Sequence, residues 1–333
     1  MPDHALLIGG TRFLGRATAE EFLDHGYEVT LFTRGNREDP FADREGVEHV
    51  EGDRRTDEDL ESAAETVDPD VVVDLVAYYP RDVRVATDLF ADVDAYVYVS
   101  SGAAYGSEAI PKREDETPLE PCSEEQATDD SWDSYGARKA EGDRAVFAAA
   151  EEAGVNATSV RPPIVYGPHD YTDRYRYWIQ RVRDHDRVIV PGDGTNLWHL
   201  VFVETVARGI RTVAERGTAG EAYNVGDRQL LTLGDLVEAI ADAVGTDVEV
   251  VTACGRELAA GDLEPGDFPL YRDPPHVLST TKLDDLGWEA VPVETAIEQT
   301  VDHYLDVMEP GVDLDAGPGR ESEERVLGVL ETL

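Results

Sequence analysis

Basic residues are scarce in this chain of 333 residues. Lysine and arginine together number 29 against 71 aspartate and glutamate residues, which gives a formal net charge of -42. Three of the basic residues are lysines: Lys112, Lys139 and Lys282. Such a charge repels nucleic-acid phosphate and anionic membrane surfaces in ordinary salt, and it argues against both as partners. Because the acids are spread along the chain and arginine replaces lysine, the composition indicates a cytoplasm of molar salt.

Cysteines and long apolar runs are also lacking. Cys122 and Cys254 are far apart and form no metal-binding or redox spacing, so we expect no metal site and a reducing compartment. No apolar run approaches the roughly 18 residues of a membrane-spanning helix, and no basic leader precedes the first apolar segment. The sequence therefore predicts a soluble, cytoplasmic protein.

Short apolar runs alternate with longer segments of helical spacing. We expect strands at 5–8, 28–32, 71–75, 95–100 and 158–161. This alternation predicts an α/β fold with a doubly wound parallel sheet of the Rossmann type.

The chain is expected to divide into a large domain and a smaller C-terminal lobe. Residues 1–165 form the predicted dinucleotide-binding domain, to which segments near 203–226 return. From about Val165 glycine and proline become more frequent, so 166–309 is expected to be mainly a substrate-binding lobe. The segment 310–333 is predicted as a linker and a terminal helix.

The first predicted strand runs into a glycine-rich segment. It comprises Gly9, Gly10, Thr11, Arg12, Phe13, Leu14 and Gly15. A strand, glycines and a helix N-terminus bring backbone N–H groups against a pyrophosphate, so this segment is the candidate cofactor loop. Gly9 suits a tight turn and Gly15 a close packing of helix on strand, whereas Arg12 stands where a third glycine is usual.

The end of the second strand favours NADP over NAD. A cofactor with a free 2'-hydroxyl usually meets an acid about 20 residues after the glycines, but Thr33 and Arg34 occupy this place. Arg12 and Arg34 could bind a 2'-phosphate, or both could pair with the abundant carboxylates. Asp53 could accept a hydrogen bond from an adenine amino group, or it is an incidental surface acid.

Tyr135 and Lys139 lie four residues apart, which places them one turn apart on one face of a helix. An ammonium group beside a phenol favours the phenolate, so the pair is a candidate acid/base. Asp133 or Ser134 is the candidate N-cap of this helix and Gly154 its terminator.

Taken in order, these motifs resemble those of the extended short-chain dehydrogenase/reductase family, of the NAD(P)-dependent epimerase/dehydratase type. The resemblance runs over most of the chain and rests on Gly9 to Gly15, Ser101 to Gly106, Tyr135 with Lys139, Arg161-Pro162, Tyr166-Gly167-Pro168, Tyr223-Asn224-Val225-Gly226 and Lys282 followed by Leu286-Gly287-Trp288. It implies a nicotinamide cofactor, a small-molecule substrate such as a nucleotide sugar, and a homodimer.

The resemblance also implies roles for three side chains. Tyr135 would be the catalytic acid/base, Lys139 would make its phenol more acidic and hold the nicotinamide ribose, and Ser101 would donate to the reacting oxygen. Dehydratases of this family carry acids directly after the serine or threonine, whereas this chain has Gly102 and Ala103. Dehydration is therefore disfavoured, which leaves an epimerase or a reductase, and the arginines above tilt the choice towards a reductase.

The substrate is less well indicated. Sugar-nucleotide members of the family carry a diphosphate-binding arginine where this chain has Trp198, and Arg272 is a candidate replacement. His169 is a candidate for the substrate cleft. Without that arginine, a reductase of a non-nucleotide carbonyl compound is an alternative.

A second alternative is a non-catalytic RNA-binding relative. The glycine-rich loop, followed after the second strand by Thr33-Arg34-Gly35, also resembles the chloroplast stem-loop-binding proteins. The complete set of Ser101, Tyr135 and Lys139 argues against this reading, as does the negative charge.

Overall fold

The chain divides into two units, each assembled from segments that are distant in sequence. The structure is a computed structural model that describes residues 4–309, 312 and 314–332. The first unit contains the chain up to Val165, Val203–Gly226 and Leu278–Ala290. The second contains Tyr166–Phe202, Asp227–Val277 and the chain from Val291 onwards.

A seven-stranded sheet forms the centre of the first unit, in the order β10-β6-β5-β4-β1-β2-β3. Its strands are β1 (His4–Ile8), β2 (Glu28–Thr33), β3 (Val47–Glu51), β4 (Val71–Asp74), β5 (Ala95–Val99), β6 (Ala157–Arg161) and β10 (Ala222–Asn224). All neighbouring strands are parallel. The chain winds outward from β1 in one direction and from β4 in the other, which confirms the predicted Rossmann-type sheet.

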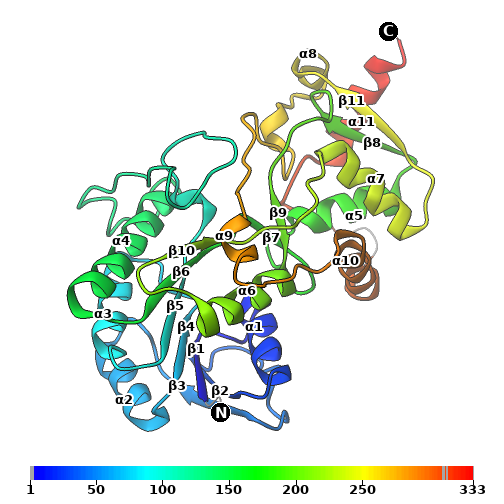
Figure 1. Ribbon diagram of the computed structural model, residues 1–333. Coiled ribbons are helices and arrows are strands. Elements are labelled where there is room, and N and C mark those ends of the chain that lie inside the picture. Colours follow the sequence, from blue (N-terminus) through cyan, green and yellow to red (C-terminus); the bar gives the residue numbers. More distant parts are fainter. Residues whose placement is uncertain (1–3, 310–311, 313, 333) are drawn as a thin grey trace. The chain divides into compact units, whose positions relative to one another are not determined.

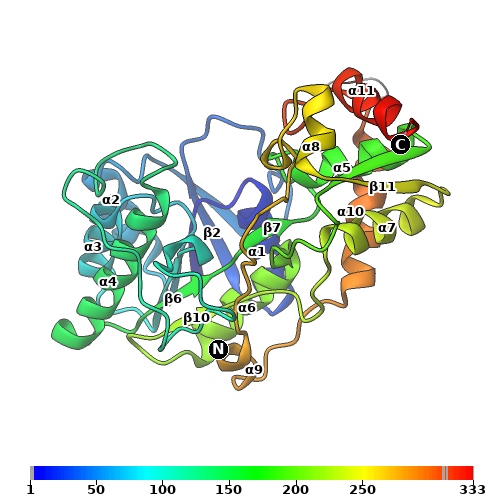
Figure 2. The same cartoon turned by 90° about the horizontal axis from the view of Figure 1, so that it is seen from above.

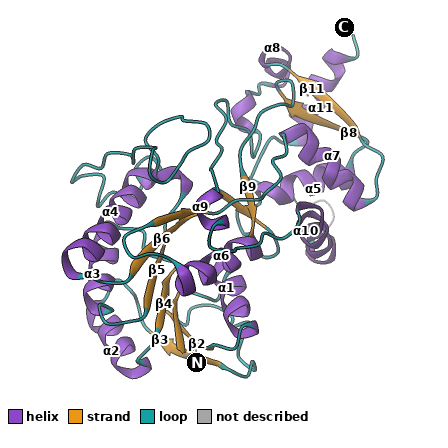
Figure 3. Ribbon diagram, viewed as in Figure 1, coloured by secondary structure: helices purple, strands orange, loops and turns teal. Residues whose placement is uncertain are grey.

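Helices cover both faces of this sheet (Figures 1 and 3). One face carries α2 (Asp57–Val67), α3 (Pro80–Leu89) and α4 (Tyr135–Ala153), and the other carries α1 (Phe13–Asp24) and α6 (Val203–Arg216). The strand residues Ile8, Val72 and Tyr96 belong to one buried cluster with Val83 of α3 and Val146 of α4. Because both faces are buried, the central strands read as continuous apolar runs.

Residues 278–290 lie in the first unit, whereas the sequence analysis placed them in the C-terminal lobe. They include the short helix α9 (Thr281–Asp284). Leu283 and Trp288 are buried, and the indole Nε1 of Trp288 donates to the carbonyl oxygen of Thr205 in α6 at 3.2 Å. This packing against α6 holds a late segment to the first sheet, and neither periodicity nor composition signals it.

The second unit combines four short strands with five α-helices of the described chain (Figure 2). These are β7 (Ile164–Tyr166) at its boundary, α5 (Arg174–Asp184), β8 (Arg187–Pro191), β9 (Leu200–Phe202), α7 (Leu233–Val244), β11 (Glu249–Ala253), α8 (Gly255–Leu258), α10 (Val293–Val307) and α11 (Arg320–Leu330). Strands β8 and β11 pair in parallel, and α5, α7 and α10 pack on one another.

The predicted terminal helix corresponds to α11, while the predicted linker falls partly on residues 310, 311 and 313, which with 333 lie outside the described residues. Within the described ranges no helix combines the length and apolar character needed to cross a bilayer.

Candidate active site

Strand β1 ends in a loop whose backbone conformation is one that glycine adopts most readily. Gly9 and Gly10 have φ angles of 112° and 119°. A Cβ atom on Gly15 would lie 2.6 Å from the Cα of Gly10, so the first turn of α1 packs directly on the loop. Helix α1 begins at Phe13 with Arg12 as its N-cap. The first N–H groups of a helix lack partners within it, so this loop can receive a pyrophosphate.

Arg34 and Asp53 share an open cleft of about 590 Å³ that follows the ends of β2 and β3. The cleft is lined by Arg34, Asn36, Glu51, Gly52, Asp53 and Asp59. The structure therefore brings Arg34 and Asp53 together, but Arg12 is not among the lining residues. A single guanidinium group shares this lining with three carboxyl groups.

Ser101 lies two residues after the end of β5 and is the N-cap of a 3-10 turn over Gly102–Ala104. The residue is 9% exposed, and its Oγ accepts a hydrogen bond from the backbone N–H of Ala103 at 3.1 Å. A hydroxyl group that accepts this bond keeps its own proton for donation. Ser101 is thus held as a hydrogen-bond donor at the carboxyl edge of the sheet.

Helix α4 approaches the Ser101 turn very closely. A Cβ atom on Gly136 would lie 2.5 Å from the carbonyl oxygen of Ala103, which is shorter than any side chain tolerates. The glycine beside Tyr135 is therefore required for this packing. It places the first turn of α4, which carries Tyr135, against the turn that Ser101 begins.

Helix α4 begins and ends at residues that the sequence analysis named. Ser134, one of the two candidate residues, is the N-cap, and Gly154 ends the helix with a φ of 72°. The Ser134 side chain makes no cap bond; its Oγ instead donates to Oδ2 of Asp129 at 2.6 Å.

Lys139 is nearly inaccessible, with 2% of its surface exposed. Its Nζ donates to the carbonyl oxygens of Ala77 at 2.9 Å and Val99 at 2.8 Å, at the carboxyl edge of the sheet. These bonds use two of the three N–H donors of an ammonium group. Burial lowers the pKa of Lys139 to about 8, and the Asp74 carboxylate opposes this shift.

The Lys139 ammonium group also faces the tyrosine one turn away. Its Nζ lies 6.0 Å from the centroid of the Tyr135 ring. A buried lysine with a perturbed pKa beside a tyrosine is typical of a functional site and not of a solvated surface. The structure thus collects Ser101, Tyr135 and Lys139 at one edge of the first sheet.

A buried ionic cluster near Lys139 escaped the sequence analysis. Arg54 forms an ion pair with Asp74 and donates to the carbonyl oxygen of Asp82 at 3.1 Å. The Tyr96 hydroxyl donates to Oδ2 of Asp74 at 3.2 Å. Arg54 is 6% exposed and Asp74 fully buried. The available signal was Asp74 itself, a charged residue at the end of an otherwise apolar strand.

The three candidate substrate residues, Trp198, Arg272 and His169, lie in the second unit, and His169 is apart from the other two. The guanidinium carbon of Arg272 lies 5.7 Å from the centroid of the Trp198 ring, so these two residues come together. The ring of His169 is instead 4.4 Å from that of His303, and its backbone N–H donates to Nε2 of His303 at 3.2 Å.

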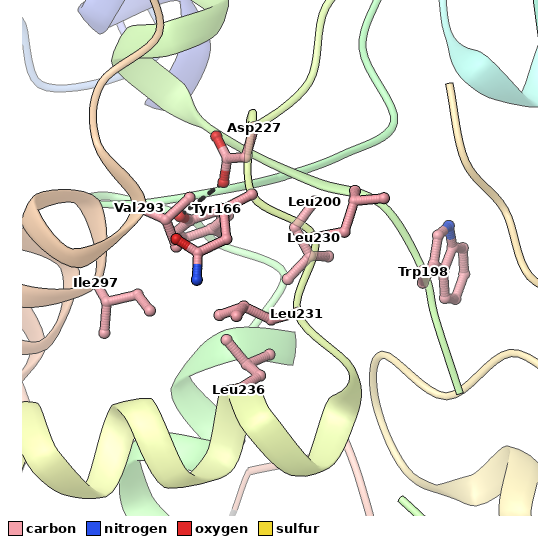
Figure 4. A pocket seen from close by; sticks show the side chains of 10 residues that line it. Tyr166, Trp198, Leu200, Asp227, Leu230, Leu231, Leu236, Val293 and Ile297 are labelled. Atoms are coloured by element: carbon pink, nitrogen blue, oxygen red, sulfur yellow. Dashed lines mark hydrogen bonds between the residues drawn. The ribbon is translucent and has the colours of Figure 1, made fainter. Parts of the chain in front are cut away.

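Asp227 is a second buried ionisable residue that the sequence analysis missed (Figure 4). Its carboxyl group accepts hydrogen bonds from the Tyr166 hydroxyl at 2.9 Å and from the Phe202 backbone N–H at 3.0 Å. Burial raises the pKa of Asp227 to about 7, although both hydrogen bonds oppose the shift. The Tyr166 ring stacks on Tyr175 with centroids 4.7 Å apart.

A small, mainly apolar pocket adjoins Asp227 within the second unit (Figure 4). It is lined by Tyr166, Trp198, Leu200, Asp227, Gln229, Leu230, Leu231, Leu236, Val293 and Ile297. Its volume of about 20 Å³ is enough for a water molecule and too small for a cofactor. In the described part of the chain, no group of three or more histidine, cysteine, aspartate or glutamate residues could hold a metal ion.

Two curated relatives align with nearly the whole chain. The chloroplast stem-loop binding protein of 41 kDa b from Arabidopsis thaliana is 28% identical over 96% of this chain and 81% of its own length. The low-salt glycan biosynthesis protein Agl12 from Haloferax volcanii is 27% identical over 90% of this chain and 98% of its own length.

Solved structures share the fold. A dTDP-glucose 4,6-dehydratase from Bacillus anthracis in complex with NAD has a TM-score of 0.72 and 22% identity, covering 92% of this chain and 97% of that structure. A UDP-glucose 4-epimerase from Thermotoga maritima with UDP-glucose has a TM-score of 0.72 and 21% identity, covering 92% and 100%.

A family model decides the membership of the chain. It matches residues 5–92 and 83–226, which include the glycine loop, Arg34 and the serine, tyrosine and lysine described above. The matched region is more than half of the 333 residues. The chain therefore belongs to the NAD dependent epimerase/dehydratase family.

Proposed function

We propose that this protein is a nicotinamide-dependent epimerase or reductase that acts at a carbinol or carbonyl carbon of a nucleotide sugar. The observation that carries the proposal is Lys139, which is buried against two main-chain carbonyls one turn from Tyr135. Family membership and the dehydratase and epimerase relatives support it.

The residues of the first unit fit a nicotinamide cofactor. The glycine-rich loop leads directly into the N-terminus of α1, an arrangement that suits a pyrophosphate, and the third N–H of Lys139 is proposed to bind a ribose hydroxyl. Lysine suits this task because its donors are compact and rotatable. When bound, the cofactor would accept or supply the hydride.

Each of the three site residues has a distinct task in this proposal. Tyr135 takes the proton from the substrate hydroxyl, or returns it in the reverse direction. The charge of Lys139 stabilises the phenolate form of Tyr135 during that transfer. Ser101 donates its hydroxyl proton to the substrate oxygen and orients it for Tyr135.

Epimerisation or reduction is favoured over dehydration. The two residues after Ser101 are Gly102 and Ala103, so no carboxyl group follows the serine to remove a proton from carbon. Several relatives are nevertheless dTDP-glucose 4,6-dehydratases. Product analysis with dTDP-glucose and UDP-glucose distinguishes the classes, because a dehydratase releases a 4-keto-6-deoxy sugar.

Trp198 and Arg272 support the nucleotide-sugar assignment. The indole offers a stacking face and the guanidinium group a bidentate phosphate contact, and the two lie together. His169 remains a proposed substrate residue at a separate place. A non-nucleotide carbonyl substrate is the competing proposal, and the same product analysis with simple ketones and aldehydes tests it.

Tyr135→Phe is the decisive variant. Loss of the phenol proton should lower turnover by roughly 10²- to 10⁴-fold while cofactor affinity stays unchanged. Nicotinamide absorbance measures turnover, and cofactor fluorescence measures binding. Tyr171→Phe, at a tyrosine that is 55% exposed, serves as the matched control. Full turnover by Tyr135→Phe would show that the catalytic assignment is wrong.

We infer a preference for NADP from Arg34. It is the one cationic side chain among the residues that line the cleft after β2 and β3, and a guanidinium group binds a 2'-phosphate well. Asp53 in the same cleft is proposed to accept from the adenine amino group. Arg34→Asp should weaken NADP binding by about tenfold or more and change NAD binding little. Equal affinities of the parent protein for both cofactors would contradict the preference.

We also infer a homodimer in a cytoplasm of high salt. The net charge of -42 supports the salt adaptation, and the family resemblance supports the dimer. Sedimentation and activity measured across a series of KCl concentrations test both inferences.

RNA binding is the second candidate function, supported by the alignment of the chloroplast stem-loop binding protein with 96% of this chain. The net charge opposes it, although molar salt weakens that argument. A gel shift with structured RNA at molar KCl tests it. Specific retardation of the RNA, with no turnover of any nucleotide sugar, would favour this candidate.

A further inference from the structure

Trp132 is an exposed aromatic residue beside the candidate active site. It exposes 83% of its surface, more than any other large hydrophobic residue in the described part of the chain. Trp178 and Trp288, by contrast, are 0% and 3% exposed. Its position, two residues before the helix N-cap Ser134 and three before Tyr135, places a large aromatic side chain in solvent beside the candidate acid/base.

The segment that carries Trp132 is held by a buried side chain of α4. Arg138, which is 4% exposed, donates to the backbone carbonyls of Asp129 and, at 3.1 Å, of Ser131. The Tyr79 hydroxyl donates to Oδ1 of Asp130 at 2.8 Å. The backbone on the N-terminal side of Trp132 is therefore anchored to the helix that bears Tyr135 and Lys139.

A backbone hydrogen bond links Trp132 to Tyr135. The Tyr135 backbone N–H donates to the carbonyl oxygen of Trp132 at 3.1 Å. The ring centroids are 5.3 Å apart with an angle of 57° between the planes, so the two rings do not stack. The indole thus remains 83% exposed while its ring lies beside the Tyr135 ring.

We propose that Trp132 is a substrate-positioning residue whose indole packs against the apolar face of the sugar ring that reacts at Tyr135. The inference rests on the proposed function. The C–H groups on one face of a hexose form an apolar patch, which a flat indole covers well. An aromatic side chain on an anchored backbone loses little conformational entropy on binding. The reacting ring is the occupant, because it must come within hydrogen-bond reach of Tyr135.

Three substitutions separate stacking from simple apolar contact. Trp132→Ala and Trp132→Leu should raise the KM for the nucleotide sugar by about tenfold, and Trp132→Phe by much less, because phenylalanine keeps a ring face. The kcat value and the cofactor affinity should stay close to those of the parent protein. An exposed side chain can be replaced in this way with little effect on folding.

Fluorescence quenching measures the contact between Trp132 and the sugar independently of turnover. Acrylamide should quench Trp132 strongly in the free protein, and UDP-glucose or dTDP-glucose should protect it, whereas UDP or dTDP alone should not. The Trp132→Phe variant identifies the signal, since it lacks the exposed indole.

The outcomes distinguish this inference from the proposed function. If the parent protein neither binds nor turns over any nucleotide sugar, the proposed function fails and the role of Trp132 fails with it. If turnover depends on Tyr135 but Trp132→Ala and Trp132→Leu leave KM and sugar-dependent protection unchanged, only this inference is overturned. Protection that rises with protein concentration in the absence of ligand would also overturn it, because a second copy would then cover the indole.

Discussion

Two buried carboxyl groups, Asp74 in the first unit and Asp227 in the second, are compensated in different ways. In the first unit Arg54 pairs with Asp74, and Nε of Arg161 donates to Oδ2 of Asp143 at 2.9 Å. In the second unit the two hydrogen bonds that Asp227 accepts come from uncharged donors, a tyrosine hydroxyl and a backbone N–H. No cation contributes to the pKa shift of Asp227.

The difference lies in what offsets the loss of hydration at each of these two carboxyl groups. Beside Asp74, the Coulomb attraction of the Arg54 guanidinium group offsets the loss of hydration. A buried carboxyl group with neutral donors only is partly protonated near neutral pH, as the pKa of about 7 for Asp227 indicates. Asp227 can therefore gain or lose a proton near neutral pH.

Arg54→Met should produce the largest change. It removes the cation and leaves Asp74 and Asp82 as uncompensated buried carboxyl groups, which costs about 3–5 kcal/mol in free energy of unfolding. Urea denaturation at pH 8 and constant high salt measures this loss.

The matched control is Arg84→Met, which breaks an exposed pair between Arg84 and Glu141 of the same unit. Because solvent screens exposed pairs, a loss of about 0–1 kcal/mol is expected. The double variant Arg54→Met/Asp74→Asn should recover part of the stability. Equal losses for the Arg54 and Arg84 variants would contradict the contrast between buried and exposed pairs.

Asp227→Asn should have a smaller effect that depends on pH. The pKa of Asp227 is raised from 3.8 to about 7 on folding, so the native state binds more protons than the unfolded state between these values. The stability of the parent protein therefore falls as the pH rises through this window. The asparagine variant lacks this penalty, and its stability relative to the parent should improve by roughly 2–3 kcal/mol from pH 5 to pH 8.

Tyr166→Phe provides the control for this titration. It removes one donor to Asp227 and retains the ring that stacks on Tyr175, so a loss of about 1 kcal/mol at pH 8 is expected. The pH range over which stability falls should extend to higher pH, because the ionised Asp227 carboxyl group has lost a hydrogen bond. A constant difference between the Asp227→Asn variant and the parent protein across the pH range would show that Asp227 keeps its charge.

Local motifs made much of the first unit predictable. The glycine loop, the central strands and the tyrosine and lysine of α4 each depend on a spacing that is visible in the sequence. Strand β3 gave a weaker signal, because its Val47–Glu51 segment is partly exposed and holds two apolar residues, Val47 and Val50, among polar ones. Residues 278–290 gave none, since the burial of Trp288 on α6 joins residues far apart in the chain.

The sequence by itself determined the fold class and the family, because glycine positions, strand periodicity and one helical turn are local properties of the chain. The tertiary structure decided which charges are buried and with which partners. Arg54 and Asp74 are 20 residues apart and meet at 6% and 0% exposure, while Asp227 receives its donors from Tyr166 and Phe202. Desolvation and Coulomb energies depend on distances in space, and these distances exist only once the chain has folded.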